Sequence, residues 1–355
     1  MKNLLLTIFS IFSVLSFAQI EITTNDLPSP GDTNRVSIAI LPDSIDYVTT
    51  GANQTWDFSF LEPEQQYVDS FMTVAETGTA FSFTFSFPLG DATMAQPEVS
   101  GLTVGTLELE DMVSFYKNAA SEYEMQGYGA YLNGLPIPVK YDDAERIYSF
   151  PINYLDTDSD YFEYGTEIPN VGYYGQSGVR ETEIDGWGSV TTPYGTFDAL
   201  RVKVKLAIRD TIAYTGFPGF AINRPIQYEY KWITNDEKIP VLKIQTTEIA
   251  GEEIVNAIEY RDNYVSGLLA VSPKEKNKVI AFPNPTKDWI NIGGMSNNSK
   301  TIEIFNAAGA LVYSMQSQNI QEKIFLAPLN LEAGHYIISI SQNGRRSVHS
   351  FIYLN

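Results

Sequence analysis

The sequence predicts an all-β protein whose antiparallel sheets form a sandwich or a half-barrel. Several segments alternate apolar and polar side chains with a period of two, which is typical of strands with one buried face. The chain contains 25 Gly and 18 Pro residues, and those that fall between the alternating segments mark turns. Hydrophobic residues make up 44% of the 355 residues, which is enough to build a core. Segments that could pass for helices are short and lack capping residues.

The first 18 residues are predicted to be a signal peptide. Lys2 supplies a positive charge, an apolar run extends over 4–15, and Ala18 ends a small-x-small cleavage site. The apolar run is too short to cross a bilayer as a helix, which needs about 20 residues. No later run is long enough either. We therefore expect an exported chain that begins at Gln19 and does not span a membrane.

The mature chain divides into two parts of opposite charge. Residues 19–271 hold 38 acidic and 14 basic side chains, a net charge of −24, whereas residues 272–355 hold 5 and 8, a net of +3. A polar, charged stretch at 271–278 is typical of a linker. This predicts an acidic β-rich body at 19–270 and a tail at 279–355. Because such a body repels phosphate backbones, we expect no nucleic-acid partner.

Alternation predicts the main strands of the body. Half-buried strands are expected at 81–87, where Phe alternates with Ser or Thr, at 200–208, and at 228–232, where aromatic residues share one face. A turn at 235–238 then leads into a further strand at 241–249.

The tail contains a strong hairpin signal. Asn343-Gly344 suits the two central positions of a type I′ turn, both of which need φ > 0. A two-residue loop at this point fixes the register of the flanking strands. The predicted pairs are Ile340 with Ser347, Ile338 with His349, and Tyr336 with Phe351.

Three segments of the tail together carry a resemblance to a known family. They are FPNPTKDWINI at 282–292, IFNAAGALVY at 304–313 and LNLEAGHYIISISQNGRR at 329–346. In this order they resemble the type A C-terminal sorting domain of the type IX secretion system. The residues that match its motif are Pro283, Asn284, Pro285, Gly309, Gly334 and Tyr336.

The resemblance implies a small immunoglobulin-like β-sandwich from a Gram-negative member of the Bacteroidota. It also implies two partners, the Sec machinery and the type IX machinery, which would act in turn. The protein would then be secreted, or attached to the outer-membrane surface through lipopolysaccharide. The alternative is an immunoglobulin-like domain that binds some other ligand, because a fold alone does not set a function.

The body contains no Cys and no His, since both histidines lie in the tail. It therefore cannot carry a Ser-His-Asp or Cys-His mechanism or a His-ligated zinc site. Carboxylate chemistry, an oxygen-ligand metal site or no catalysis remain. The 38 acidic residues offer many pairs, so the sequence assigns no catalytic residue and no cofactor other than a weak calcium candidate.

The calcium candidate consists of Asp156, Asp158 and Asp160. With Glu167 at the twelfth position, these residues have the acidic spacing of a calcium loop. Tyr161 stands where such a loop has glycine, and no helix is expected on either side. An acidic turn between strands is the interpretation that we favour.

A row of basic residues gives a second candidate site. Arg201, Lys203 and Lys205 share one face of a predicted strand, and Arg209 follows closely. They could bind an anionic ligand. Pairing with acidic residues on neighbouring strands is the favoured interpretation.

Part of the body resembles the curved half-barrel sheets of periplasmic lipoprotein-carrier-like proteins. The resemblance covers residues 188–249: a strand, a charged hairpin and a return strand that is entered through Pro240. That family holds acyl chains against its concave face, so the resemblance implies an apolar ligand.

Three functions for the body follow. The leading hypothesis is a non-enzymatic module of a cell-surface or secreted protein, which binds a glycan, a lipid or a neighbouring surface protein. The alternatives are a carbohydrate-active hydrolase that uses paired carboxylates and a half-barrel carrier of an apolar ligand.

Overall fold

The computed structural model describes residues 19–98, 102–104, 107–132, 134–168, 172–214, 219–266, 268, 280–293, 295, 299–342 and 345–354. Three predicted features lie outside this set: the signal peptide (1–18), the linker (271–278) and the turn at Asn343-Gly344. No helix within the described residues is both long and apolar enough to cross a membrane.

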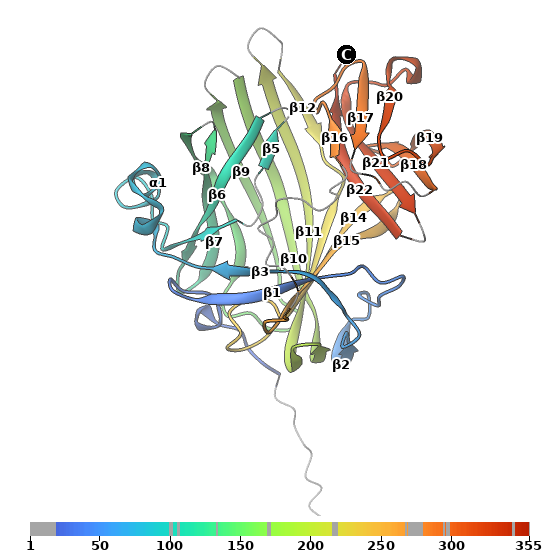
Figure 1. Cartoon of the computed structure of the whole chain (residues 1–355). Coiled ribbons are helices and arrows are strands. Elements are labelled where there is room, and N and C mark those ends of the chain that lie inside the picture. Colours follow the sequence, from blue (N-terminus) through green and yellow to red (C-terminus); the bar gives the residue numbers. More distant parts are fainter. Residues whose placement is uncertain are drawn as a thin grey trace, which may run out of the picture.

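A single curved sheet forms the body (Figure 1). Its strands are β1 (Thr33–Ala39), β2 (Gly51–Asp57), β3 (Pro63–Ser70), β4 (Met94–Pro97), β5 (Leu102–Val104), β6 (Leu107–Asn118), β7 (Glu122–Leu132), β8 (Leu135–Ser149), β9 (Thr157–Ile168), β10 (Gly172–Thr192), β11 (Gly195–Tyr214), β12 (Phe220–Asn223), β13 (Gln227–Ile233), β14 (Leu242–Ile249) and β15 (Glu252–Arg261). Their spatial order is β3-β1-β15-β14-β13-β11-β10-β9-β8-β7-β6-β4, with β2, β5 and β12 attached to β10, β6 and β11. Among the described residues, two short 3₁₀ turns accompany these strands, η1 (Thr24–Asp26) and η2 (Val74–Thr77), and a third, η3 (Ala327–Leu329), lies in the tail.

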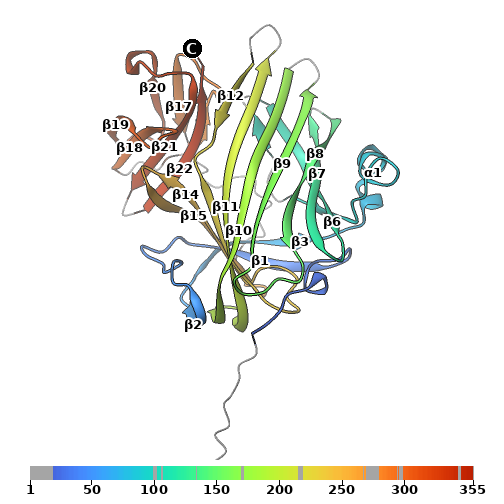
Figure 2. The same cartoon turned by 180° about the vertical axis from the view of Figure 1, so that it is seen from behind.

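The curved sheet bends until its two edges meet. Just beyond β3, Met72 exchanges two backbone hydrogen bonds of 2.9 Å with Ala95 of β4. The long strands β9, β10 and β11 form the wall that faces the viewer in Figure 2. Of the two predicted forms of the body, the half-barrel is therefore the one observed.

The two faces of the curved sheet pack against different partners. On β13, Trp232 is fully buried beside Trp56 and Phe58, which belong to the segment around β2. The next residue toward the N-terminus, Lys231, lies on the opposite face and lines a cavity. Alternation along β13 thus places Trp232 on the outer face and Lys231 on the inner face, where Lys231 lies opposite the apolar Val202 of β11.

The expected strand at 81–87 is wrong, because a short helix, α1 (Thr79–Phe85), occupies most of this segment. Phe81 and Phe85 are buried one helical turn apart, and Phe85 stacks on Phe115 at 3.8 Å between ring centroids. Phe83 and Phe87 are exposed. A run with Phe at every second position also places two Phe residues at i and i+4, so the pattern fits a helix equally well.

The other predicted body strands are confirmed. Residues 200–208 lie within β11, residues 228–232 within β13, and the return strand at 241–249 corresponds to β14. Along β11, Leu200, Val202 and Val204 are fully buried, as the alternation predicted.

The tail forms two further sheets that pack face to face. One contains β16 (Ile280–Phe282), β17 (Trp289–Gly293) and β20 (Glu322–Phe325); the other contains β18 (Lys300–Asn306), β19 (Leu311–Ser317), β21 (Gly334–Gln342) and β22 (Arg345–Tyr353). Their facing side chains share one core that includes Ile290, Ile304 and Phe351. All three predicted cross-strand pairs are observed in the register of β21 with β22.

The outer face of the four-stranded tail sheet docks on the body (Figure 1). Ile337 and Phe305 point away from the tail core and pack against Ile249 at the tip of the β14–β15 hairpin. His335 lies nearby and is only 7% exposed. Burial lowers the pKa of its imidazole to about 4, so this contact holds a neutral His at neutral pH.

Candidate functional site

A cavity of about 300 Å³ lies inside the curved sheet. Strands from both halves of the sheet contribute to its wall, and the segment around η1 closes part of it. Ionisable side chains of both signs line the cavity: Asp26, Asp69, Glu145, Arg180, Glu229, Lys231, Lys238, Lys243 and Glu259.

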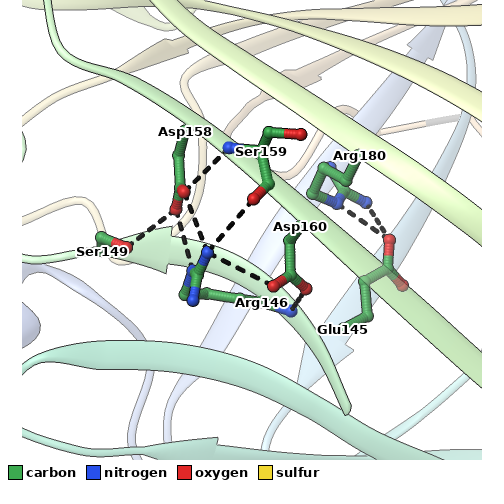
Figure 3. A network of polar contacts seen from close by, with 7 residues as sticks. All are labelled: Glu145, Arg146, Ser149, Asp158, Ser159, Asp160 and Arg180. Carbon is green, nitrogen blue, oxygen red and sulfur yellow. Dashed lines mark hydrogen bonds and ion pairs between the residues drawn. The ribbon is translucent and has the colours of Figure 1, made fainter. Parts of the chain in front are cut away.

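A chain of ion pairs crosses one side of the cavity. Arg180 of β10 lies 2.7 Å from the carboxylate of Glu145 on β8 and 3.5 Å from that of Glu229 on β13. The Lys231 ammonium is 2.7 Å from the same Glu229 carboxylate. Burial alone would raise the pKa of Glu229, but Lys231 and Arg180 hold it well below its usual range. Figure 3 shows the Glu145–Arg180 pair between its two strands.

A second group of charges lies on β14 and β15, which follow β13 in the sheet. The Lys243 ammonium on β14 is 2.5 Å from the Glu259 carboxylate on β15. Burial would lower the pKa of Lys243, but Glu259 and Glu229 raise it above its usual value. The two groups of ion pairs are therefore coupled through Glu229, and the cavity wall is charged at neutral pH.

Asp69 of β3 is a carboxyl group in this wall whose pKa is shifted toward neutral pH. Burial raises its pKa to about 6, Gln96 and Lys243 oppose the shift, and Glu259 and Glu98 add to it. Its hydrogen bond from the Gln96 amide is 3.1 Å long. Asp69 therefore changes charge near pH 6, unlike an ordinary surface carboxylate.

The pKa of Asp69 predicts how stability depends on pH. The folded state binds this proton more tightly than the unfolded chain, whose Asp has a pKa near 3.8. The resulting stabilisation is present below pH 3.8 and is lost as the pH rises through 6. We expect Asp69→Asn to be more stable than wild type at pH 7.5 by about 1–2 kcal/mol, which is about 2–8 °C in melting temperature. Melting curves of both proteins at pH 4.5 and 7.5 check this, and equal pH slopes would contradict it.

Aromatic side chains form another part of the wall. Tyr116 and Tyr123 stack with 5.2 Å between ring centroids, and Tyr123 stacks on Tyr148 at 6.5 Å. Burial raises the pKa of Tyr116 and Tyr123 well above 10, so their hydroxyls stay neutral. The cavity thus combines ring surfaces, hydroxyls and charged hydrogen-bonding groups, which suits a polar ligand that also has an apolar face.

None of the charged cavity residues was singled out from the sequence. Glu229 and Lys231 occupy the polar positions of an alternating strand, which usually face solvent. Only the curvature of the sheet turns that face inward. A weak signal was available, because Glu229 and Lys231 place opposite charges two residues apart on one face of β13.

The structure places the three Asp residues of the calcium candidate around Arg146 and a backbone turn. Arg146 donates two hydrogen bonds of 2.9 Å to Asp158 and one backbone hydrogen bond of 2.7 Å to Asp160 (Figure 3). Asp156 accepts a hydrogen bond from the Asn153 amide. The described residues contain no group of three potential ligands.

Calcium at this position stays a prediction, and the ion would have to displace Arg146. Titration calorimetry tests it. Saturable heat on calcium addition that disappears in Asp158→Asn would support the site, and the absence of heat would remove it.

Basic residues of the row on β11 form ion pairs and ring contacts with neighbouring side chains. Arg201 is 1% exposed and pairs with Asp185, and its guanidinium lies 4.9 Å from the Tyr230 ring centroid. Lys205 forms a 2.8 Å pair with Glu181 on the adjacent strand. These contacts agree with the favoured interpretation of cross-strand pairing.

The residues of the sorting motif occupy structural positions in the tail. The Asn284 side chain between Pro283 and Pro285 accepts a hydrogen bond from the Ile352 amide at 2.8 Å. Tyr336 donates one to the Glu332 carbonyl at 2.8 Å, and Gly334 begins β21.

Gly309 has a positive φ of 78° and faces the Ala250 backbone so closely that a Cβ would lie 2.3 Å from the Ala250 nitrogen. It therefore permits the tail to approach the body.

Comparison with protein families identifies the tail. Residues 280–354 match the model of the secretion system C-terminal sorting domain. The tail is a type IX sorting domain. The resemblance predicted from its three segments is therefore confirmed, and the chain is an exported protein that this secretion system delivers to the cell surface or beyond.

Two individual proteins are similar to this chain over part of their length. An ulvan lyase of Nonlabens ulvanivorans is 29% identical over 94 residues, which is 26% of this chain and 17% of that protein. The structure of PorZ, an essential surface component of the type IX secretion system of Porphyromonas gingivalis, aligns over 74% of this chain and 58% of PorZ, with 9% identity and a TM-score of 0.21. That TM-score is too low to indicate a shared fold. The chain spans less than two thirds of either protein.

Proposed function

We propose that the body is a non-enzymatic binding module that holds a small polar ligand, a neutral saccharide, in the cavity of the curved sheet. The observation that carries this proposal is the chain of ion pairs Glu145–Arg180–Glu229–Lys231 that faces the cavity. Charged groups held in place on rigid strands can exchange hydrogen bonds with hydroxyl groups without first having to be ordered.

The character of the wall separates the proposal from the carrier hypothesis. An acyl chain in this cavity would have to cover the carboxylates and cations without giving them hydrogen bonds, which is unfavourable. A saccharide presents hydroxyls at its rim and C–H groups on its ring faces. The stacked tyrosines and the ion pairs match these two surfaces.

The size of the cavity limits the ligand. At about 300 Å³ it falls at the lower end of the range for small-molecule sites, which is about 300–1,000 Å³. We therefore propose a monosaccharide or the end unit of a longer glycan. A lipid with a long chain does not fit this volume.

Titration calorimetry tests the proposal on the mature protein. The probes are glucose, galactose, xylose, cellobiose and, as an apolar competitor, palmitate. The cavity-blocking variant is Ile239→Trp, because Ile239 is half-buried in the cavity wall. The matched control is Ile320→Trp, since Ile320 is 64% exposed on the tail.

We expect saturable heat with at least one saccharide. Its dissociation constant should rise at least tenfold in Ile239→Trp and stay at the wild-type value in Ile320→Trp. Binding of palmitate alone, no saturable heat with any saccharide, or equal affinity in Ile239→Trp would each contradict the proposal.

A hydrolase that uses paired carboxylates is the second candidate. The observation that favours it is the raised pKa of Asp69 beside Glu259 and Glu98, since one protonated and one ionised carboxyl are what glycoside hydrolysis needs. Release of reducing ends from a polysaccharide panel, lost in Asp69→Asn, would support it. The panel includes ulvan because of the partial similarity to an ulvan lyase.

The route of export completes the proposal. We propose that Sec recognises residues 1–18 and that cleavage follows Ala18, so that the mature chain consists of the body (19–270), a linker (271–278) and the sorting domain (279–355). The protein then remains attached to the outer-membrane surface or is released. Its acidic body disfavours nucleic acid as a partner.

A further inference from the structure

The two outer faces of the sorting domain have different surroundings. Side chains on the outer face of the four-stranded sheet are buried although they point away from the tail core: Ile337 is 2% exposed and Ser339 is fully buried. Ile337 and Phe305 contact Ile249 of the body, and Gly309 meets the Ala250 backbone. In the folded chain this face is therefore occupied.

The outer face of the three-stranded sheet carries aromatic side chains. On β17 and β20, Ile290 and Ile324 point into the tail core, so the alternate residues Trp289, Lys323 and Phe325 point outward. Phe325 is 60% exposed, and Phe282 on β16 is 39% exposed. We call the four residues Phe282, Trp289, Lys323 and Phe325 the aromatic face.

Lys323 is held between two rings of the aromatic face. Its ammonium lies 4.1 Å from the Trp289 ring centroid and 5.2 Å from that of Phe325. Trp289 and Phe325 are direct cross-strand partners. Contact with the rings orders the lysine side chain before any partner arrives, which lowers the entropy lost on binding.

We propose that the aromatic face is the surface through which an acidic protein surface of the secretion machinery recognises the sorting domain. The secretion machinery must recognise the sorting domain while it is still attached to the body. The body already covers the outer face of the four-stranded sheet, so the outer face of the three-stranded sheet is the one left accessible. Exposed aromatic residues around one cation are typical of protein-binding sites. Lys323 supplies a positive charge at the centre of this face, which complements an acidic partner. The sorting domain (280–354), with 5 basic and 4 acidic side chains, also lacks the acidic excess of the body.

The test measures export of the full chain in a bacterium that carries the type IX machinery. The variants are Lys323→Gln, Lys323→Glu and Phe325→Ser. Leu311→Ser is the matched control, because Leu311 is 53% exposed on β19 of the other sheet. Melting curves of each purified protein confirm that the tail folds, and quantitative immunoblots of periplasm, cell surface and medium give the exported fraction.

We expect Leu311→Ser to be exported like wild type and Phe325→Ser to accumulate in the periplasm at least fivefold. Lys323→Glu should be retained more strongly than Lys323→Gln, because charge reversal repels an acidic partner. Wild-type export of Phe325→Ser and Lys323→Glu would overturn the proposal. Normal export followed by loss from the cell surface would overturn it too, since the aromatic face would then bind a surface glycan. These outcomes do not depend on the ligand of the body.

Discussion

Replacing Arg180 with methionine should lower the free energy of unfolding of the body by about 3–5 kcal/mol. Arg180 is buried between two carboxylates, at 2.7 Å from Glu145 and 3.5 Å from Glu229. Methionine fills a similar volume but leaves the buried Glu145 carboxylate without its cation. For a body of this size the melting temperature should fall by about 6–20 °C.

The control for this prediction is Lys205→Met. Lys205 also forms a close pair, at 2.8 Å from Glu181, but both side chains are exposed, so the expected change is below about 1 kcal/mol. Adding Glu145→Gln to Arg180→Met should recover part of the loss, because it removes the unpaired charge. Equal melting temperatures for Arg180→Met and Lys205→Met would show that the cavity ion pairs contribute no more than surface pairs.

Replacing Phe351 with alanine should lower the melting temperature of the sorting domain and leave that of the body unchanged. Phe351 is fully buried in the tail core and stacks on Tyr336 at 5.6 Å between ring centroids. Loss of a buried Phe side chain costs about 3–5 kcal/mol. In a domain of this size, each kcal/mol of lost unfolding free energy lowers the melting temperature by about 4–8 °C. The melting temperature of the variant tail should therefore lie at least about 12 °C below that of the wild-type tail.

Scanning calorimetry distinguishes the two modules in this experiment. The tail transition should move and the body transition should stay within about 2 °C, because Phe351 belongs to the tail core and not to the clusters inside the body. Leu311→Ala is the control, since Leu311 is exposed. A common shift of both transitions would mean that the docked modules unfold as one cooperative unit.

The tail could be predicted from its sequence in more detail than the body. The two-residue turn expected at Asn343-Gly344 predicts the register that is observed for β21 with β22, because a type I′ turn of this length leaves no freedom in the pairing of the flanking strands. A two-residue loop also joins β10 to β11 of the body, between Thr192 and Gly195, but it sets the register of that one pair of strands only. Alternation within each strand was visible there, but the bending of the sheet into a half-barrel depends on contacts between β3 and β4 at its edges.

Two kinds of ambiguity explain what the sequence left undetermined. Phe at alternate positions in 81–87 also gives an i, i+4 pair, so the pattern fits a strand and a helix equally well. The helix is the form in which Phe85 packs on Phe115. Glu229 and Lys231 have the pattern of a solvated face, yet they line the cavity. A strand pattern tells which side chains share a face, and only the curvature tells whether that face is outside or inside.

We expect the export signal to lie in the tail and to be separate from the body. Fractionation of cells that produce either the full chain or a chain ending at Ser272 measures this most directly. The full chain should appear at the surface or in the medium, and the shortened chain should accumulate in the periplasm with its body folded. Equal amounts of both outside the cell would contradict the account.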